Sequence, residues 1–189
     1  MSFLDTDIAV AKNMFEVNFF GTLAMTKAFS SLLKDSRGAI VNIGSEAGNH
    51  GIPCTDCYST SKTAVSSLTA KLRKELSPFG VSVIGVSTGG VGTTSLQNAS
   101  FTDLPTPSRD PPAKETLKRM VNGTRTVNAW NIDRYAKVVV ENVCRRKPKM
   151  NLLAGSSTLK AEACLWKLGS VSFLLVNEMI RPDQHDTAS

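Results

Sequence analysis

A tyrosine and a lysine four residues apart are the pair in this sequence best suited to acid–base chemistry. Tyr58 and Lys62 stand in the segment Tyr-Ser-Thr-Ser-Lys, and helical spacing places both side chains on one face. A nearby ammonium group favours the phenolate, as a general acid or base for an alcohol and carbonyl pair requires. Because the spacing also arises by chance on solvated helix faces, the surrounding elements must decide its meaning.

A hydroxyl group precedes this pair at the end of an apolar run. Residues 39–43 read Ala-Ile-Val-Asn-Ile, which is typical of a buried parallel strand, and Ser45 follows them closely. A glycine-containing loop then leads to Tyr58. At the end of such a strand, the Ser45 hydroxyl could polarise the oxygen of a substrate.

Helical and strand patterns alternate through the first 154 residues. Such alternation predicts an α/β fold in which helices cover a parallel sheet and ligands lie beyond the carboxyl ends of the strands. Ser45 and the loop 88–93 both occupy that position. The expected elements are a helix that begins at Asp5 or Asp7 and ends near Lys34, a strand at 39–43, a helix at 58–76, a strand at 81–86, a helix at 133–145 capped by Asp133, and a strand at 149–154.

We expect a single domain over residues 1–189, because no repeat or linker interrupts the chain. Residues 98–113 contain four prolines and predict a mobile loop. Residues 161–180 are apolar and predict a C-terminal helix. Charged residues interrupt this stretch before it reaches the roughly 20 residues that a membrane-spanning helix needs. A buried or interface helix is therefore favoured, with peripheral attachment to lipid as the alternative.

The net charge of +6 is spread along the chain rather than gathered in a stripe that could bind nucleic acid. We therefore expect no nucleic-acid partner. The summed positive field would instead favour an anionic ligand, such as a phosphorylated cofactor. The N-terminus has neither the basic nor the apolar region of a signal peptide, which favours a cytoplasmic location.

Four cysteines bear on metal and redox chemistry. Cys54 and Cys57 form a Cys-x-x-Cys pair, but Cys144, Cys164 and the two histidines supply no matching second pair for a structural zinc site. A redox pair is an alternative. Because the pair lies in a predicted loop, we favour reduced, structural cysteines and no metal.

Together these features resemble the short-chain dehydrogenase/reductase family. In that family a strand that ends in Asn-x-x-Ser, here Asn42 to Ser45, precedes Tyr-x-x-x-Lys by this distance. Asn18, within Phe-Glu-Val-Asn-Phe-Phe-Gly, resembles the helix asparagine of the family's catalytic tetrad, and residues 88–93 resemble the loop beside the nicotinamide. The resemblance covers residues 1 to about 155 and implies a Rossmann-like three-layer sandwich.

The resemblance also implies a role for each residue. Tyr58 would donate or accept the proton, Lys62 would favour the phenolate and hold the nicotinamide ribose, and Ser45 would orient the substrate carbonyl. Asn18 would support a proton-relay water. The residues expected to contact the cofactor, NADP or alternatively NAD, are Asn18, Tyr58, Lys62, Gly89, Val91 and Thr93. A homodimer through the helices at 5–34 and 58–77 is implied as well.

One departure within the loop resembles a particular branch of the family. Thr88 and Gly89 stand where most members have Pro-Gly, and this resembles the fungal branch related to 1-acyl-dihydroxyacetone-phosphate reductases. That likeness, together with residues 161–180, suggests peripheral association with a lipid droplet or the endoplasmic reticulum membrane.

A larger departure concerns the start of the domain. The sequence lacks the Gly-x-x-x-Gly-x-Gly turn and the Asn-Asn-Ala-Gly segment of the family, so it resembles an N-terminally truncated domain with three strands. Strand 39–43 would then form an exposed apolar edge, which natural proteins avoid. Three explanations are open: a fragment of a full reductase, a short protein whose edge is covered by a partner, and a diverged protein that binds no nicotinamide.

Three functions are compatible with this sequence. The first is an NADP(H)-dependent carbonyl reductase or alcohol dehydrogenase for a small-molecule substrate of lipid or secondary-metabolite biosynthesis. The second is a cofactor-free acid–base enzyme, such as an isomerase or cyclase, that uses the same site. The third is a non-catalytic pseudoenzyme that dimerises, although such a protein would not need Asn18, Ser45, Tyr58 and Lys62.

Overall fold

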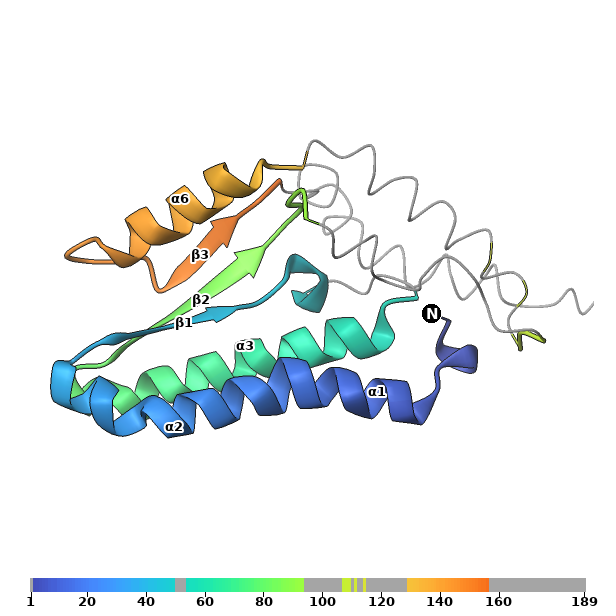
Figure 1. Ribbon diagram of the computed structural model, residues 1–189, viewed down its shortest axis with the longest axis horizontal. Coiled ribbons are helices and arrows are strands. Elements are labelled where there is room, and N and C mark those ends of the chain that lie inside the picture. The colour runs from blue at the N-terminus through green and yellow to red at the C-terminus, as the bar shows by residue number, and fades with distance from the viewer. Residues whose placement is uncertain are drawn as a thin grey trace, which may run out of the picture. The chain divides into compact units, whose positions relative to one another are not determined.

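The sheet that carries the candidate site has three parallel strands (Figure 1). They are β1 (Ala39–Ile43), β2 (Ser82–Thr88) and β3 (Asn151–Ala154), in the order β1-β2-β3. The structure is a computed structural model and describes residues 2–49, 54–93, 107–109, 111, 114 and 129–156. Because the strands are parallel, their carboxyl ends lie at the same edge of the sheet, as the sequence predicted.

The first long helix contains a wider turn in its middle. α1 (Ile8–Phe15) passes through a π-helical turn (Glu16–Phe20) into α2 (Gly21–Ser36). Asp7 caps its start, because the carboxylate accepts a hydrogen bond of 2.7 Å from the backbone N–H of Ala9. The predicted extent of the helix is confirmed, whereas the π-helical turn is a feature that the apolar spacing did not predict.

Two further helices lie close to their predicted positions. α3 (Asp56–Leu76) carries Tyr58 and Lys62, and α6 (Ile132–Val143) precedes β3. The predicted cap of α6, Asp133, is wrong. Asp133 lies in the first turn of the helix, where its own backbone N–H needs an acceptor, and the side chain of Asn131 accepts that hydrogen bond at 2.7 Å.

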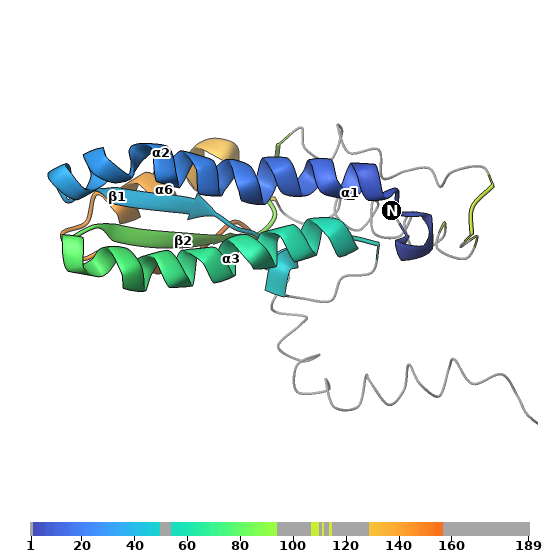
Figure 2. The same cartoon turned by 90° about the horizontal axis from the view of Figure 1, so that it is seen from below.

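Helices cover both faces of the sheet (Figures 1 and 2). α1, α2 and α3 lie along one face, and α6 lies on the other. Successive residues of β2 therefore point into two different cores: Val83 packs with Leu72 of α3, whereas Ile84 and Val86 pack with Val139 of α6. A strand buried on both faces requires such a continuous apolar run. The α/β three-layer fold is thus confirmed.

β1 is an edge strand among the described elements, and it pairs only with β2. A groove of about 550 Å³ is lined by β1, the π-helical turn and α2, and Asn18 and Lys62 are among its lining residues. Ile43, at the carboxyl end of the strand, is 45% exposed. The apolar edge that the sequence predicted for residues 39–43 is therefore present in the described part of the chain.

Two sequence predictions fall mainly on residues that the structure does not describe. The expected mobile loop at 98–113 is described only at residues 107–109 and 111, and the expected helix at 161–180 lies wholly outside the described residues. Both stay predictions, as does the single domain over residues 1–189. Among the described helices, none has the length and apolarity to cross a membrane.

Candidate active site

Asn18 is held against the helix that carries Tyr58. It lies in the π-helical turn, and its side-chain amide donates a hydrogen bond of 3.0 Å to the hydroxyl of Ser61. Ser61 in turn donates a bond of 2.7 Å to the backbone carbonyl of Tyr58. Two helices that are distant in sequence are therefore joined within one turn of the predicted catalytic tyrosine.

The Lys62 amine lies between Tyr58 and the end of β1. Its Nζ is 5.9 Å from the centroid of the Tyr58 ring and donates a hydrogen bond of 3.2 Å to the backbone carbonyl of Ile43. Burial lowers the pKa of Lys62 below the value of 10.5 for a solvated lysine, because the ammonium form loses hydration. The amine is thus partly desolvated and close to the phenol, as the spacing of the two residues predicted.

Ser45 lies in a turn that packs against α3. Its hydroxyl accepts a hydrogen bond of 3.2 Å from the backbone N–H of Ala47 and so opens the short helical turn Glu46–Asn49. Gly48 in this turn is so close to α3 that an added Cβ would lie 3.0 Å from the backbone nitrogen of Thr63. This contact holds the turn after β1 beside the N-terminal half of α3 (Figure 1).

The loop after β2 is fixed by backbone hydrogen bonds to neighbouring segments. Gly89 N–H donates to Ala154 at 2.9 Å, and Gly92 N–H donates to Trp130 at 2.9 Å. An added Cβ on Gly89 would lie 2.3 Å from the backbone oxygen of Ser156. Glycine at position 89 is therefore required by the close approach of two backbone segments, independently of any cofactor.

The structure brings the predicted site residues together to different degrees. Asn18 and Tyr58 are joined through Ser61, Lys62 contacts the last residue of β1, and Ser45 follows that strand at the same edge of the sheet. The residues of the β2 loop, Gly89, Val91 and Thr93, also follow a strand end at this edge. Their catalytic and cofactor-binding roles stay predictions.

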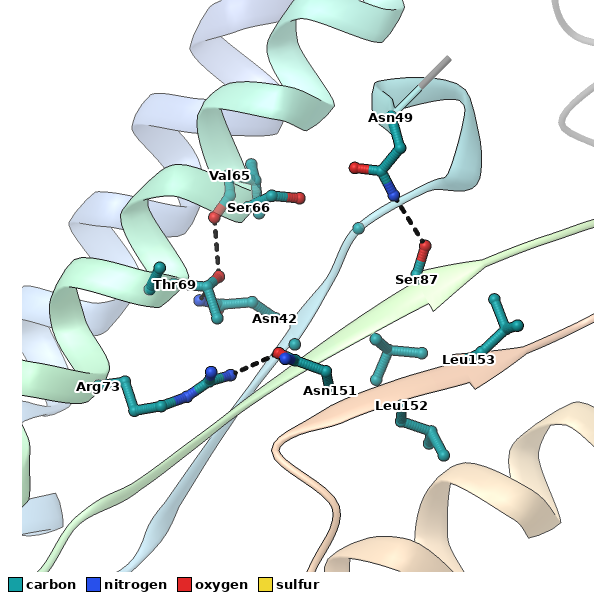
Figure 3. A pocket seen from close by; sticks show the side chains of 14 residues that line it. Asn42, Asn49, Val65, Ser66, Thr69, Arg73, Ser87, Asn151, Leu152 and Leu153 are labelled. Carbon is teal, nitrogen blue, oxygen red and sulfur yellow. Dashed lines mark hydrogen bonds between the residues drawn. The ribbon is translucent and has the colours of Figure 1, made fainter. Parts of the chain in front are cut away.

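A second pocket, of about 300 Å³, lies between α3, β2 and β3 (Figure 3). Among the described residues that line it, Arg73 alone is charged. Its guanidinium donates hydrogen bonds to the backbone of Val83 and Met150 and to the side chain of Asn151. These bonds join α3 to two strands. None of the predicted catalytic side chains lines this pocket, so it is separate from the candidate active site.

Ser61 is a site residue that the sequence did not single out. The buried positions of α3 are Ser61, Val65 and Thr69, spaced four residues apart. A helix face at this spacing usually carries apolar side chains into the core. Two hydroxyls on such a face were therefore a signal that this surface contacts polar groups of other elements, but the sequence could not say which ones.

The Cys-x-x-Cys pair lies at the start of α3 rather than wholly in a loop. Cys57 and Cys144 carry free thiols. Burial and the neighbouring Asp56 carboxylate raise the pKa of the Cys57 thiol, which disfavours the reactive thiolate. Among the described residues, no group of three or more metal-ligating side chains comes together.

Comparison with known sequences identifies the family. The family model for short chain dehydrogenase matches residues 1–104. Short-chain dehydrogenase virD of Hypocrea virens is 35% identical over 158 residues, which cover 84% of this chain and 54% of that protein. Short-chain dehydrogenase srdE of Neurospora crassa is 38% identical over 158 residues, which cover 82% and 53% of the two chains. The chain belongs to the short-chain dehydrogenase family and spans about half the length of these curated relatives.

Solved structures agree with this assignment. A short-chain dehydrogenase from Streptomyces avermitilis superposes with a TM-score of 0.69 at 21% identity and covers 94% of this chain and 63% of its own, which shows the shared fold. One from Burkholderia cenocepacia in complex with NADP has a TM-score of 0.56 at 26% identity and covers 93% and 61%. The family resemblance drawn from the sequence is confirmed, whereas the finer likeness to 1-acyl-dihydroxyacetone-phosphate reductases stays a prediction.

Proposed function

We propose that this chain provides the catalytic residues of an NADP(H)-dependent oxidoreductase that interconverts a small-molecule carbonyl and its alcohol. The observation that carries this proposal is the position of Lys62. Its amine is 5.9 Å from the Tyr58 ring and bonds to Ile43 at the end of β1, where Ser45 follows. This arrangement places a phenol, an amine and a hydroxyl at the carboxyl edge of a parallel sheet, where ligands bind in such folds.

Each residue has a distinct part in the proposed reaction. Tyr58 gives its hydroxyl proton to the carbonyl oxygen in the reduction and takes a proton from the alcohol in the oxidation. Ser45 donates a hydrogen bond to the same oxygen and so polarises the carbonyl. The hydride for the carbonyl carbon would come from a nicotinamide held at this edge of the sheet. Lys62 would hold the ribose hydroxyls of that cofactor, and Asn18 would support the water through which the proton of Tyr58 is replaced.

The donor groups beside the β1 groove fit the nicotinamide ribose. An ammonium group has three N–H donors, and Ile43 accepts from one of those on Lys62. Within the part of the chain that the structure describes, the hydroxyl of Tyr58 has no hydrogen-bond partner and is available to a ligand. The net charge of +6 and the related structure with bound NADP support the phosphorylated cofactor, with NAD as the alternative.

A titration of the purified chain with NADPH tests the proposal. We expect nicotinamide fluorescence to change and the Tm to rise together, because a ligand that binds only the folded state stabilises it by about 2.7 kcal/mol at a hundredfold excess over Kd. The same titration with NADH compares the two cofactors. A folded chain whose Tm and fluorescence respond to neither nucleotide would contradict the proposed function.

We also propose that two copies pair through the helices at 5–34 and 58–77. α1 and α2 expose several large apolar side chains, among them Ile8 at 67% and Leu32 at 64% exposure. Exposed apolar side chains of this kind support such an interface. Sedimentation equilibrium should give twice the chain mass. A single-chain mass at micromolar concentration would contradict the dimer.

The substrate context and the location are parts of the same proposal. A role in lipid or secondary-metabolite biosynthesis and peripheral association with a lipid droplet or the endoplasmic reticulum membrane are supported by the subfamily likeness. A cytoplasmic location is part of the same proposal. Residues 161–180, which would contact lipid, lie outside the described residues.

A further inference from the structure

We propose that Ser61 is a positioning residue of the active site, an inference that depends on the function proposed above. Ser61 is completely buried and lies on α3 between Tyr58 and Lys62. Its hydroxyl satisfies two partners at once: it accepts from the Asn18 amide at 3.0 Å and donates to the Tyr58 carbonyl at 2.7 Å. Removing the Ser61 hydroxyl takes the acceptor from the Asn18 amide, whereas the Tyr58 carbonyl lies within α3, where backbone N–H groups also bond to carbonyls.

The bond to Ser61 matters because Asn18 lies in an irregular part of its helix. In a π-helical turn each backbone bond spans one residue more than in an α-helix, and the turn persists only where its surroundings favour it. Thr22, in the first turn of α2, donates its hydroxyl to the Asn18 carbonyl at 2.8 Å. The Asn18 side chain is the part that contacts α3. Ser61 thus fixes the distance between Asn18 and the Tyr58–Lys62 pair.

The same helix contains a second hydroxyl with equivalent bonds but without catalytic neighbours. Thr69 accepts from the Asn42 amide at 2.9 Å and donates to the Val65 carbonyl at 2.7 Å (Figure 3). Like Ser61, it is buried and joins α3 to another element. Loss of the Thr69 hydroxyl therefore removes the same two kinds of hydrogen bond as loss of the Ser61 hydroxyl. It does not, however, remove a bond to Tyr58, Lys62 or Asn18. This makes Thr69→Val a matched control.

The first test compares turnover of a carbonyl substrate with NADPH by the full chain and its variants. We expect Ser61→Ala to lower kcat by about ten- to a hundredfold at nearly unchanged KM, since misplacement by about 1 Å can cost as much as about a hundredfold. Thr69→Val should lower kcat less than about twofold. If Ser61 acts through Asn18, the double variant Asn18→Ala with Ser61→Ala should lose no more than Asn18→Ala alone.

The second test needs no activity. Amide hydrogen exchange at residues 16–20 should accelerate by about tenfold or more in Ser61→Ala and stay unchanged in Thr69→Val, because only the first variant releases the π-helical turn. If Ser61→Ala does not fold, Asn18→Ala removes the same hydrogen bond by deleting the donor. Amide exchange at residues 16–20 in Asn18→Ala then tests whether this bond holds the turn.

The outcomes separate this inference from the function on which it depends. If exchange accelerates in Ser61→Ala but the wild type shows no turnover with either nicotinamide, the proposed function is contradicted. The link between Ser61 and Asn18 is then still supported. Unchanged exchange at 16–20, or an equal loss of kcat in Thr69→Val, would overturn the positioning role of Ser61.

Discussion

Tyr58→Phe should abolish most of the catalytic activity while leaving the fold intact. The variant removes only the phenol oxygen, which has no partner among the described residues, so packing around the ring is kept. A positioned general acid contributes about 10²- to 10⁴-fold to a proton transfer, and kcat should fall by that factor. Steady-state kinetics of carbonyl reduction with NADPH measure the loss, and binding of NADPH should persist.

The chain supplies a matched control for this substitution in its second tyrosine. Tyr135, on α6, pairs its hydroxyl with that of Thr88 at 2.8 Å. Tyr135→Phe therefore loses a hydrogen bond of about 1 kcal/mol but no catalytic group, so the Tm should fall slightly at nearly unchanged kcat. Equal kcat for Tyr58→Phe and the wild type would refute the role of Tyr58. Turnover by the wild type without any nucleotide would favour the cofactor-free acid–base enzyme instead.

Lys62→Met should combine a large loss of activity with a characteristic change in stability. The ammonium beside Tyr58 is lost, and with it the donor for the ribose hydroxyls. We expect kcat/KM to fall by about 10² or more. Because burial lowers the pKa of Lys62, the charged lysine also opposes folding, and methionine fills the same space without that cost.

The pH dependence of this effect has a fixed sign. Below the lowered pKa of folded Lys62, the wild type bears the full cost of burying the ammonium. As pH rises from that pKa toward 10.5, the folded state releases its proton before the unfolded chain does, so wild-type stability increases relative to the variant. Loss of the hydrogen bond to Ile43 shifts the difference by a constant but does not change the trend.

Denaturant unfolding of the wild type and Lys62→Met across this pH range measures the trend. Lys71→Met is the control, because Lys71 is an exposed lysine on the same helix whose amine bonds to the Ser67 hydroxyl at 2.8 Å. The stability difference between Lys71→Met and the wild type gives the baseline for replacing an exposed lysine of α3 with methionine. A Lys62→Met difference that does not fall below this baseline as pH rises would show that the Lys62 amine is not desolvated.

The local order of the elements could be predicted from the sequence because its signals lie within short windows. Apolar runs of five to seven residues marked β1 and β2, and helical spacing marked the helices around them. The four-residue spacing of Tyr58 and Lys62 fixed their common helix face, and Ser45 was placed by the end of β1. One local prediction, Asp133 as the cap of α6, failed. The residue that caps the helix instead, Asn131, is only two residues away.

Features that join distant parts of the chain were decided by the tertiary structure. The bond from Asn18 to Ser61 spans 43 residues, and that from Lys62 to Ile43 spans 19. The π-helical turn belongs with these features, because it forms where the Asn18 side chain meets α3. Periodicity within a helix says which face a residue occupies, but not which group from another element lies opposite it.

The sequence by itself therefore determined the α/β class, the family, the parallel strands and the helix face shared by Tyr58 and Lys62. Only the tertiary structure decided that Ser61 holds Asn18, that burial lowers the pKa of Lys62, and that Gly89 is required by its contact with Ser156. The physical reason is that hydrogen bonds, desolvation and close backbone contacts depend on distances between elements. Those distances are set by how the helices and the sheet pack together.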